Sequence, residues 1–143
     1  MKPIYVLNGP NLNRLGKREP AIYGTTTLAE VEQLCRAASG DRPIVFHQSN
    51  SEEKLIDLVH EAIDEGAGIV INPAAFSYAG YPVLDAIKMC TCPIVEVHIS
   101  NIYRRDEAWR AKSLLSPAVT GLITGLGAHG YALAVRHIAR LAR

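Results

Sequence analysis

Five short apolar runs recur along the chain, and a helical pattern follows each of the first three and the last. The runs are short and rich in Val and Ile, which is typical of strands buried inside a parallel sheet. They are Ile4–Leu7, Ile44–Phe46, Gly68–Ile71, Ile94–Ile99 and Val119–Thr124. Because strands that alternate with helices form a parallel sheet covered by those helices, the pattern predicts an α/β fold.

Four helices are expected from capping signals and apolar periodicity. Thr27–Glu30 and Ser49–Glu52 both read as capping boxes that open a helix. A third helix is predicted to begin near Pro82, since proline is favoured at the first helical position, and a fourth near Gly130. With helices on both faces, five strands favour a single flavodoxin-like domain over residues 1–143, with strand order 2-1-3-4-5.

Composition and charge narrow the possible functions. A chain of 143 residues that is 48% hydrophobic is expected to be globular, and its net charge of +1 gives no electrostatic case for binding nucleic acid. No apolar run is long enough for a membrane span, and no signal peptide is expected because Met1 leads directly into a strand. Cys35, Cys90 and Cys92 lack zinc or redox spacing, so we predict reduced thiols in a cytoplasmic protein.

The segment Gly125–Gly130 fits the dinucleotide-binding pattern G-x-G-x-x-G. That fingerprint belongs to the first strand–helix turn of a fold and needs an acidic residue about 20 positions further on. Here only 13 residues follow Gly130, and none of them forms another strand. We therefore interpret the glycines as a tight turn with close helix packing, and His129 as an exposed turn residue.

Polar side chains follow the first, third and fourth predicted strands. In doubly wound sheets ligands bind at the carboxyl ends of the strands, so these residues are expected to share one rim. They are Asn8, Asn11 and Asn13, then Asn72, then Glu96, His98, Ser100 and Asn101. Any single Asn after a strand is as readily a turn cap, and Glu96 either orients His98 or pairs with another neighbour. Taken together, the set favours a ligand site.

Two side chains in this set are suited to proton transfer. His98 can exchange a proton near neutral pH. Tyr23 belongs to the long, charged loop Leu7–Gly24; a free phenol, with a pKa of about 10, is a poor base. Arg18 can favour the phenolate by its charge, and Pro20 between them places the pair on a loop. The sequence shows no metal-ligand set, no phosphate loop and no lysine placed for a Schiff base.

Four segments of the chain resemble type II 3-dehydroquinate dehydratase. They read NGPNLNRLGKREPAIYG, VINPAAFS, VEVHISN and LSPAVTGLITGLGAHGY, and the resemblance covers about residues 4–142. It implies a flavodoxin-like fold and the removal of water from 3-dehydroquinate to give 3-dehydroshikimate in the shikimate route. The implied elimination is anti, passes through an enolate, and uses no metal, cofactor or Schiff base.

The resemblance also implies a role for each matching residue. The long loop is expected to be a lid that delivers Tyr23, the base that takes the proton from C2. Arg18 favours its phenolate, Asn11 helps to hold a water that stabilises the enolate, and His98 protonates the leaving hydroxyl.

The remaining matches concern binding and assembly. Asn72, the backbone of Ile99 and Ser100, and Arg110 are expected to hold the substrate carboxylate and hydroxyls. Asp85 is expected to approach the site of a neighbouring subunit in a dodecamer built from trimers.

Two segments depart from the family pattern. Tyr78 stands where the family usually has a substrate-contacting histidine, and we expect its phenol to enter the pocket, the alternative being that it points away. The segment after Ser100 carries one extra residue, so that Arg110 aligns best with the substrate-binding arginine and Arg105 competes for that place. These changes leave two other functions open: a lyase for a related cyclic hydroxy acid, and a non-catalytic protein that binds a small carboxylate.

Overall fold

The computed structural model describes residues 1–142, and its five strands form one parallel sheet. The strands are β1 (Ile4–Asn8), β2 (Ile44–Gln48), β3 (Gly68–Asn72), β4 (Ile94–His98) and β5 (Gly121–Thr124). Their order is β2-β1-β3-β4-β5, which confirms the predicted flavodoxin-like arrangement. Both β1 and β3 continue one residue beyond their predicted ends, into Asn8 and Asn72, and β5 begins only at Gly121.

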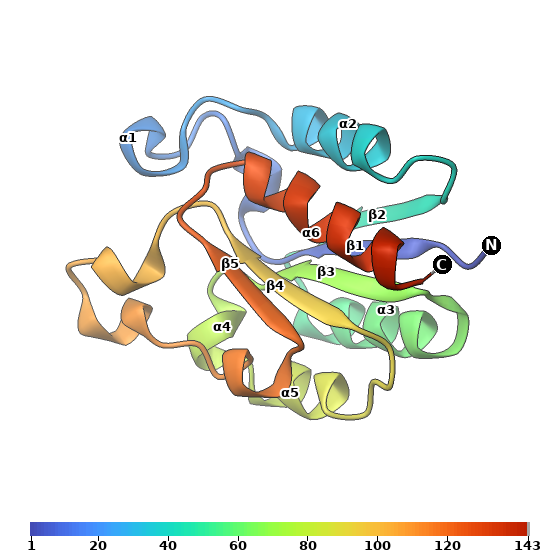
Figure 1. The fold of residues 1–143 in the computed structure, drawn as a ribbon. Coiled ribbons are helices and arrows are strands. Elements are labelled where there is room, and N and C mark those ends of the chain that lie inside the picture. The colour runs from blue at the N-terminus through green and yellow to red at the C-terminus, as the bar shows by residue number, and fades with distance from the viewer. Residues whose placement is uncertain (143) are drawn as a thin grey trace.

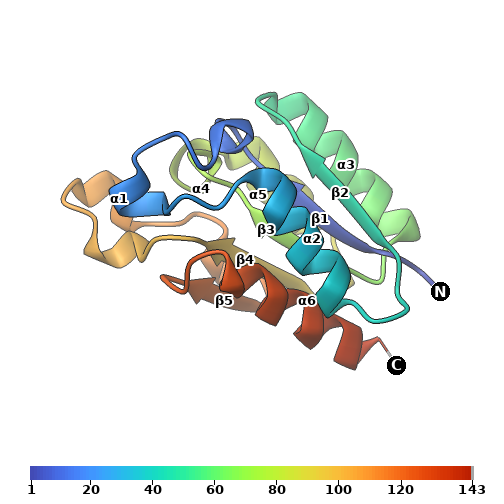
Figure 2. The ribbon, with the colours of Figure 1, turned by 90° about the horizontal axis from the view of Figure 1, so that it is seen from above.

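Two layers of helices cover the sheet. Helices α2 (Leu28–Ala38) and α6 (His129–Leu141) lie side by side on one face, whereas α3 (Glu52–Glu65) and α5 (Tyr81–Ile87) lie on the other (Figures 1 and 2). Side chains of a strand point alternately to opposite faces, so each strand supplies both layers. In β1, Ile4 and Val6 pack with the α2 and α6 side, while Tyr5 and Leu7 pack with the α3 and α5 side.

The structure confirms one predicted capping box and corrects the other. The Thr27 hydroxyl accepts from the Glu30 N–H, and the Glu30 carboxylate accepts in return from Thr27 N–H, as the sequence predicts. The Ser49–Glu52 box is wrong, because α3 is capped by Ser51, whose hydroxyl accepts from the Lys54 N–H. Ser49 instead accepts from the Ser51 N–H, so its hydroxyl holds the turn before the helix.

The glycine-rich segment after β5 is a tight turn, as predicted. Gly125 and Gly127 have φ values of +87° and +64°, a left-handed conformation that glycine adopts without strain. At Gly130 a Cβ would lie 3.1 Å from the Ile123 side chain, so the glycine allows α6 to pack closely on the sheet. His129 is exposed as expected, but it is the first residue of α6 and not a turn residue.

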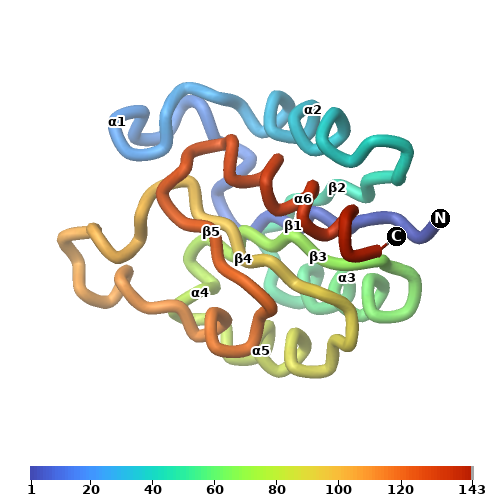
Figure 3. Tube along the Cα trace, in the orientation of Figure 1, coloured from blue at the N-terminus to red at the C-terminus, as the bar shows by residue number. Residues whose placement is uncertain are grey.

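Several short helices are not predicted by the sequence. They are η1 (Leu12–Arg14), α1 (Pro20–Tyr23), α4 (Phe76–Ala79), η2 (Ile102–Arg104), η3 (Ala108–Ala111) and η4 (Ser116–Ala118). All but η4, which leads into the start of β5, lie at the carboxyl end of the sheet. Figure 3 shows α1, α4 and the segment between β4 and β5 at the end of the molecule opposite the N-terminus and the end of α6.

Two further observations concern the molecule as a whole. Within residues 1–142, no helix is both long and apolar enough to cross a membrane. Cys35, Cys90 and Cys92 are free thiols, as predicted.

Candidate active site

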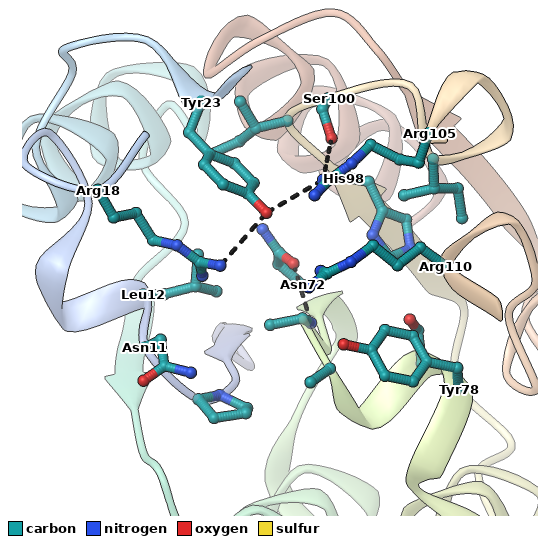
Figure 4. Close-up of a pocket in the computed structure, with 16 residues that line it drawn as sticks. Asn11, Leu12, Arg18, Tyr23, Asn72, Tyr78, His98, Ser100, Arg105 and Arg110 are labelled. Carbon is teal, nitrogen blue, oxygen red and sulfur yellow. Dashed lines mark hydrogen bonds between the residues drawn. The ribbon is translucent and has the colours of Figure 1, made fainter. Parts of the chain in front are cut away.

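A pocket of about 140 Å³ lies where β1, β3 and β4 end (Figure 4). This is the edge at which doubly wound sheets bind their ligands. The volume is below the ~300–1,000 Å³ of typical ligand pockets, which suits a small molecule. Its polar lining residues are Asn11, Arg18, Tyr23, Asn72, Ser77, Tyr78, His98, Ser100, Arg105 and Arg110.

Every residue to which the resemblance gives a role lines this pocket, except Asp85. Of the polar residues expected at this rim, Asn8, Asn13, Glu96 and Asn101 do not line it. Asp85 is exposed on α5 and does not line the pocket of its own chain. Its predicted contact with a neighbouring subunit stays a prediction.

The loop after β1 passes very close to another segment of the chain where it leaves the sheet. At Gly9 a Cβ would lie 2.4 Å from the Pro73 carbonyl oxygen, so only glycine permits this approach of the chain to the segment after β3. Asn11 follows in a left-handed conformation, with φ of 69°, and its N–H donates to the Asn50 side chain. The buried side chains of Leu12 and Leu15 then anchor the loop in the core.

The loop returns over the pocket through α1. Tyr23 is the last residue of this single helical turn, so the prediction that it lies on an irregular loop is wrong. Pro20 is the first residue of the turn, a position where its missing N–H costs no hydrogen bond. The turn points the phenol of Tyr23 into the pocket, where Figure 4 shows its oxygen between Arg18 and Arg105.

Two guanidinium groups donate to the phenolic oxygen of Tyr23. Arg18 Nη2 lies 3.3 Å from it and Arg105 Nη1 lies 3.1 Å from it. Arg18 also stacks over the phenol ring, 4.4 Å from its centre. Positive charge beside an ionisable oxygen favours its anionic form. Burial is the largest effect and disfavours the charged form of Arg105, but the hydrogen bond to Tyr23 and the charges of Tyr23, Glu107 and Glu19 together outweigh it and raise the pKa of Arg105.

His98 is held by a buried carboxylate. Glu96 and His98 are two residues apart on β4, so their side chains lie on the same face of the strand. His98 Nε2 lies 2.5 Å from Glu96 Oε2, which confirms that Glu96 orients the imidazole. The other ring nitrogen, Nδ1, has no hydrogen-bond partner within residues 1–142 and is the one left for a ligand.

Glu96 is fully buried, and two serines complete its hydrogen bonding. Ser113 donates to Oε2 at 2.6 Å and Ser116 donates to Oε1 at 2.8 Å. Burial opposes ionisation of this carboxyl, but the hydrogen bonds from His98, Ser113 and Ser116 outweigh it and lower the pKa of Glu96. Glu96 therefore favours its carboxylate form, which holds Nε2 of His98.

Asn72 is oriented by a buried tyrosine. It pairs in register with Asn8 of the neighbouring strand, and the Tyr131 hydroxyl bridges the two side chains. That hydroxyl accepts from Asn72 Nδ2 and donates to Asn8 Oδ1, both at 2.8 Å. The Asn72 oxygen accepts from the Ala74 N–H at 3.2 Å, so the amide presents a fixed face to the pocket.

Ile99 and Ser100 supply backbone groups at the rim. Their carbonyl oxygens accept from the Gly127 N–H and the Thr124 hydroxyl. Their own N–H groups have no partner in the part of the chain that the structure describes, so they are available to an anionic ligand. Arg105 Nη1 also reaches the Ser100 hydroxyl, at 3.4 Å.

Both candidate arginines line the pocket, with different neighbours. Arg105 bonds to Tyr23, whereas Arg110 lies on the same side of the pocket between His98 and Tyr78 (Figure 4). Tyr78 lines the pocket and its hydroxyl points into it, which confirms that the phenol enters the site.

Four residues that support the pocket side chains were not predicted from the sequence. Ser113 and Ser116 hold Glu96, Tyr131 holds Asn72, and Trp109 contacts Tyr78. Their positions depend on how the segments after β4 and β5 fold back, which no local pattern specifies. A buried tyrosine near the start of α6 was the one available signal, since a buried phenol needs a polar partner.

The ionisable side chains that line the pocket are two tyrosines, one histidine and three arginines. No lysine lines it. Throughout residues 1–142, no three His, Cys, Asp or Glu side chains gather in the way that metal ligands do.

Comparison with known proteins places the chain among relatives of nearly equal length. Residues 2–139 match the family model described as dehydroquinase class II. The chain is 53% identical to a 3-dehydroquinate dehydratase of Methylobacterium radiotolerans, over 96% of this chain and 93% of that protein. A 3-dehydroquinate dehydratase of Streptomyces avermitilis is 52% identical, over 98% and 89%.

A solved structure gives the same result. The type II dehydroquinase from Propionibacterium acnes superposes with a TM-score of 0.92 at 44% identity, over 98% of this chain and 97% of that chain.

Proposed function

The chain belongs to the class II dehydroquinase family and is a 3-dehydroquinate dehydratase, a hydro-lyase of the shikimate pathway, and we propose that Tyr23 and His98 are its base and its acid. The observation that carries the assignment is the phenolic oxygen of Tyr23, which receives hydrogen bonds from Arg18 and Arg105 inside the pocket that His98 lines.

The first step is removal of a proton from C2 of 3-dehydroquinate. Tyr23, as phenolate, accepts the proton, and the electrons of the C–H bond move toward the C3 carbonyl to form an enolate. The two guanidinium groups stabilise the phenolate before the transfer. Asn11 lies at the edge of the pocket, where it helps to hold a water against the enolate oxygen. Such fixed donors contribute most where charge develops.

The second step expels the hydroxyl group. His98 donates a proton from Nδ1 to the leaving oxygen, so that water leaves and the double bond of 3-dehydroshikimate forms. Glu96 holds Nε2, which leaves Nδ1 for the leaving oxygen. Tyr23 comes from the lid and His98 from the sheet, an arrangement that suits an anti elimination.

Substrate oxygens are held by groups already placed around the pocket. Asn72, the N–H groups of Ile99 and Ser100, Arg110 and the Tyr78 hydroxyl are the proposed ligands. The relatives give no support to the two alternatives, a lyase for a related cyclic hydroxy acid or a non-catalytic carboxylate-binding protein.

The proposal also covers the cellular location and the oligomeric state of the protein. A cytoplasmic location is supported by the three free thiols, which reducing compartments favour. A homododecamer is supported by the resemblance and by the exposed position of Asp85.

The test is a steady-state assay with 3-dehydroquinate, following the absorbance of the enone product. Turnover without added metal or cofactor is expected. Borohydride added with substrate should not inactivate the enzyme, since no lysine lines the pocket. Absence of turnover by the wild-type chain would overturn the proposed roles.

A further inference from the structure

Trp109 is the only tryptophan of the chain and lies on η3, just outside the pocket. Its side chain is 52% exposed, yet it contacts two residues that line the pocket. Its ring meets the Tyr78 ring edge to face, with centroids 4.8 Å apart and an angle of 80°. The guanidinium of Arg110 lies 4.4 Å from its centroid. One aromatic ring thus joins a residue of α4 to a residue of η3.

Few other contacts fix the Arg110 guanidinium. Its Nε lies 3.4 Å from the Glu107 carboxylate and is buried, but it makes no hydrogen bond within residues 1–142. A long arginine side chain loses rotational freedom when it binds a ligand. Stacking on the indole restricts the guanidinium plane before the ligand arrives.

The orientation of Tyr78 also depends on the ring of Trp109. Its hydroxyl points into the pocket and has no hydrogen-bond partner in the described part of the chain. An edge-to-face aromatic contact sets the tilt of both rings, and it therefore sets where the hydroxyl stands. The contacts of Trp109 with Tyr78 and Arg110 both lie on this wall of the pocket, so its effect is expected there.

We propose that Trp109 is a positioning residue that holds Tyr78 and Arg110 as one preformed wall for the oxygen atoms of a hydroxylated, anionic substrate. The inference rests on the proposed function, since the substrate is the one named there. Because Trp109 acts through two binding groups and not through the proton-transfer pair, it should govern KM rather than kcat.

The experiment compares the kinetics of Trp109→Ala, Trp109→Phe and Tyr103→Ala with the wild-type enzyme. Trp109→Ala is expected to raise KM about three- to tenfold with kcat within twofold of wild type. Trp109→Phe, which keeps an aromatic ring, should restore KM to within about twofold. Tyr103 is a matched control, because it is also 52% exposed, lies on the neighbouring η2 and does not line the pocket.

A double variant tests whether Trp109 acts through Arg110. If Trp109 acts through Arg110, then Trp109→Ala should raise KM little further in an Arg110→Ala background. The fluorescence of the single tryptophan should change when substrate binds to the inactive Tyr23→Phe variant, and this change should vanish when Arg110 is also replaced by Ala.

Three results would overturn the inference: an unchanged KM in Trp109→Ala, a loss confined to kcat, or fully independent effects of Trp109 and Arg110. Each presupposes an active wild-type enzyme. A wild-type enzyme without 3-dehydroquinate turnover would refute the proposed function instead, so the two failures are distinguishable.

Discussion

A phenol can act as a base near neutral pH only where its anion is stabilised, and at Tyr23 two arginines supply that stabilisation. Replacing Tyr23 by Phe removes the proton acceptor and keeps the ring. We expect turnover to fall by more than a thousandfold, with unchanged circular dichroism and thermal midpoint, because the half-buried ring remains in place. Steady-state assay and thermal melting check this, and more than a tenth of wild-type turnover would contradict it.

The two arginines beside Tyr23 lead to a prediction about how turnover depends on pH. In Arg18→Ala or Arg105→Ala, the phenolate loses one neighbouring positive charge, so turnover near pH 7 should fall by about tenfold or more. Since higher pH restores the phenolate, the variants should recover activity as pH rises, more steeply than wild type. Arg104→Ala, an exposed neighbour outside the pocket, is the control. A flat pH response in both variants would argue against phenolate stabilisation.

At the level of single residues, the sequence predicted which side chains line the pocket better than it predicted their contacts. Tyr23, Arg18 and His98 were identified because few residue types transfer protons or stabilise a phenolate. Arg105 was considered only as a substitute for Arg110, since its bond to Tyr23 joins residues 82 positions apart. Such a contact depends on the path of two loops, which local sequence patterns do not determine.

Strand β4 places the buried carboxylate that orients His98. Because the folded-state pKa of Glu96 is lowered, its contribution to stability is present above the unfolded pKa of about 4.3 and is lost as pH falls through the folded pKa. Glu96→Gln should therefore unfold at neutral pH at a lower temperature than wild type and lose less stability on acidification. It should also reduce kcat by about tenfold or more, since His98 loses its charged partner.

Melting curves between pH 7 and pH 3 measure the acid effect. The matched control is Glu32→Gln, which removes an exposed ion pair with Arg36. Exposed pairs contribute about 0–1 kcal/mol, so this variant should keep the wild-type pH profile. Equal profiles for Glu96→Gln and wild type would contradict the role given to Glu96.

The short helix α4 carries the residue that departs from the family pattern. Tyr78 presents a neutral hydroxyl to the pocket. Tyr78→Phe is expected to weaken substrate binding by about 0.5–1.5 kcal/mol, the net value of one neutral hydrogen bond. Tyr78→His should keep or improve activity. Unchanged kcat and KM in Tyr78→Phe would show that the hydroxyl does not bind substrate.

The strands were predictable, and among the helices the longer ones were predictable and the shortest ones were not. The strands and helices α2, α3, α5 and α6 carry apolar periodicity that packing on a sheet requires. Helices α1 and α4 span four residues each, too few for a period to show, and they are held by contacts across the pocket. The lid's single helical turn at Tyr23 was missed for this reason.

At the scale of the whole molecule, one surface of α5 is exposed in the described part of the chain. Tyr81, Asp85 and Met89 follow one another at intervals of four, so they form one exposed stripe along α5 and just beyond its end. Tyr81 and Met89 are 64% and 55% exposed. The stripe lies outside the pocket of its own chain, and this supports a contact with another subunit.

We therefore predict that the enzyme is a large closed homo-oligomer, a dodecamer built from trimers, and that this stripe contributes to an interface. Tyr81→Arg places a charge where apolar contact is expected, so the variant should dissociate into smaller species in light scattering and lose activity on dilution. Tyr103→Arg changes an exposed aromatic on η2, away from α5, and should assemble as the wild type does. A fully active wild-type monomer would refute the assembly, and an intact oligomer in Tyr81→Arg would move the interface to another face of the molecule.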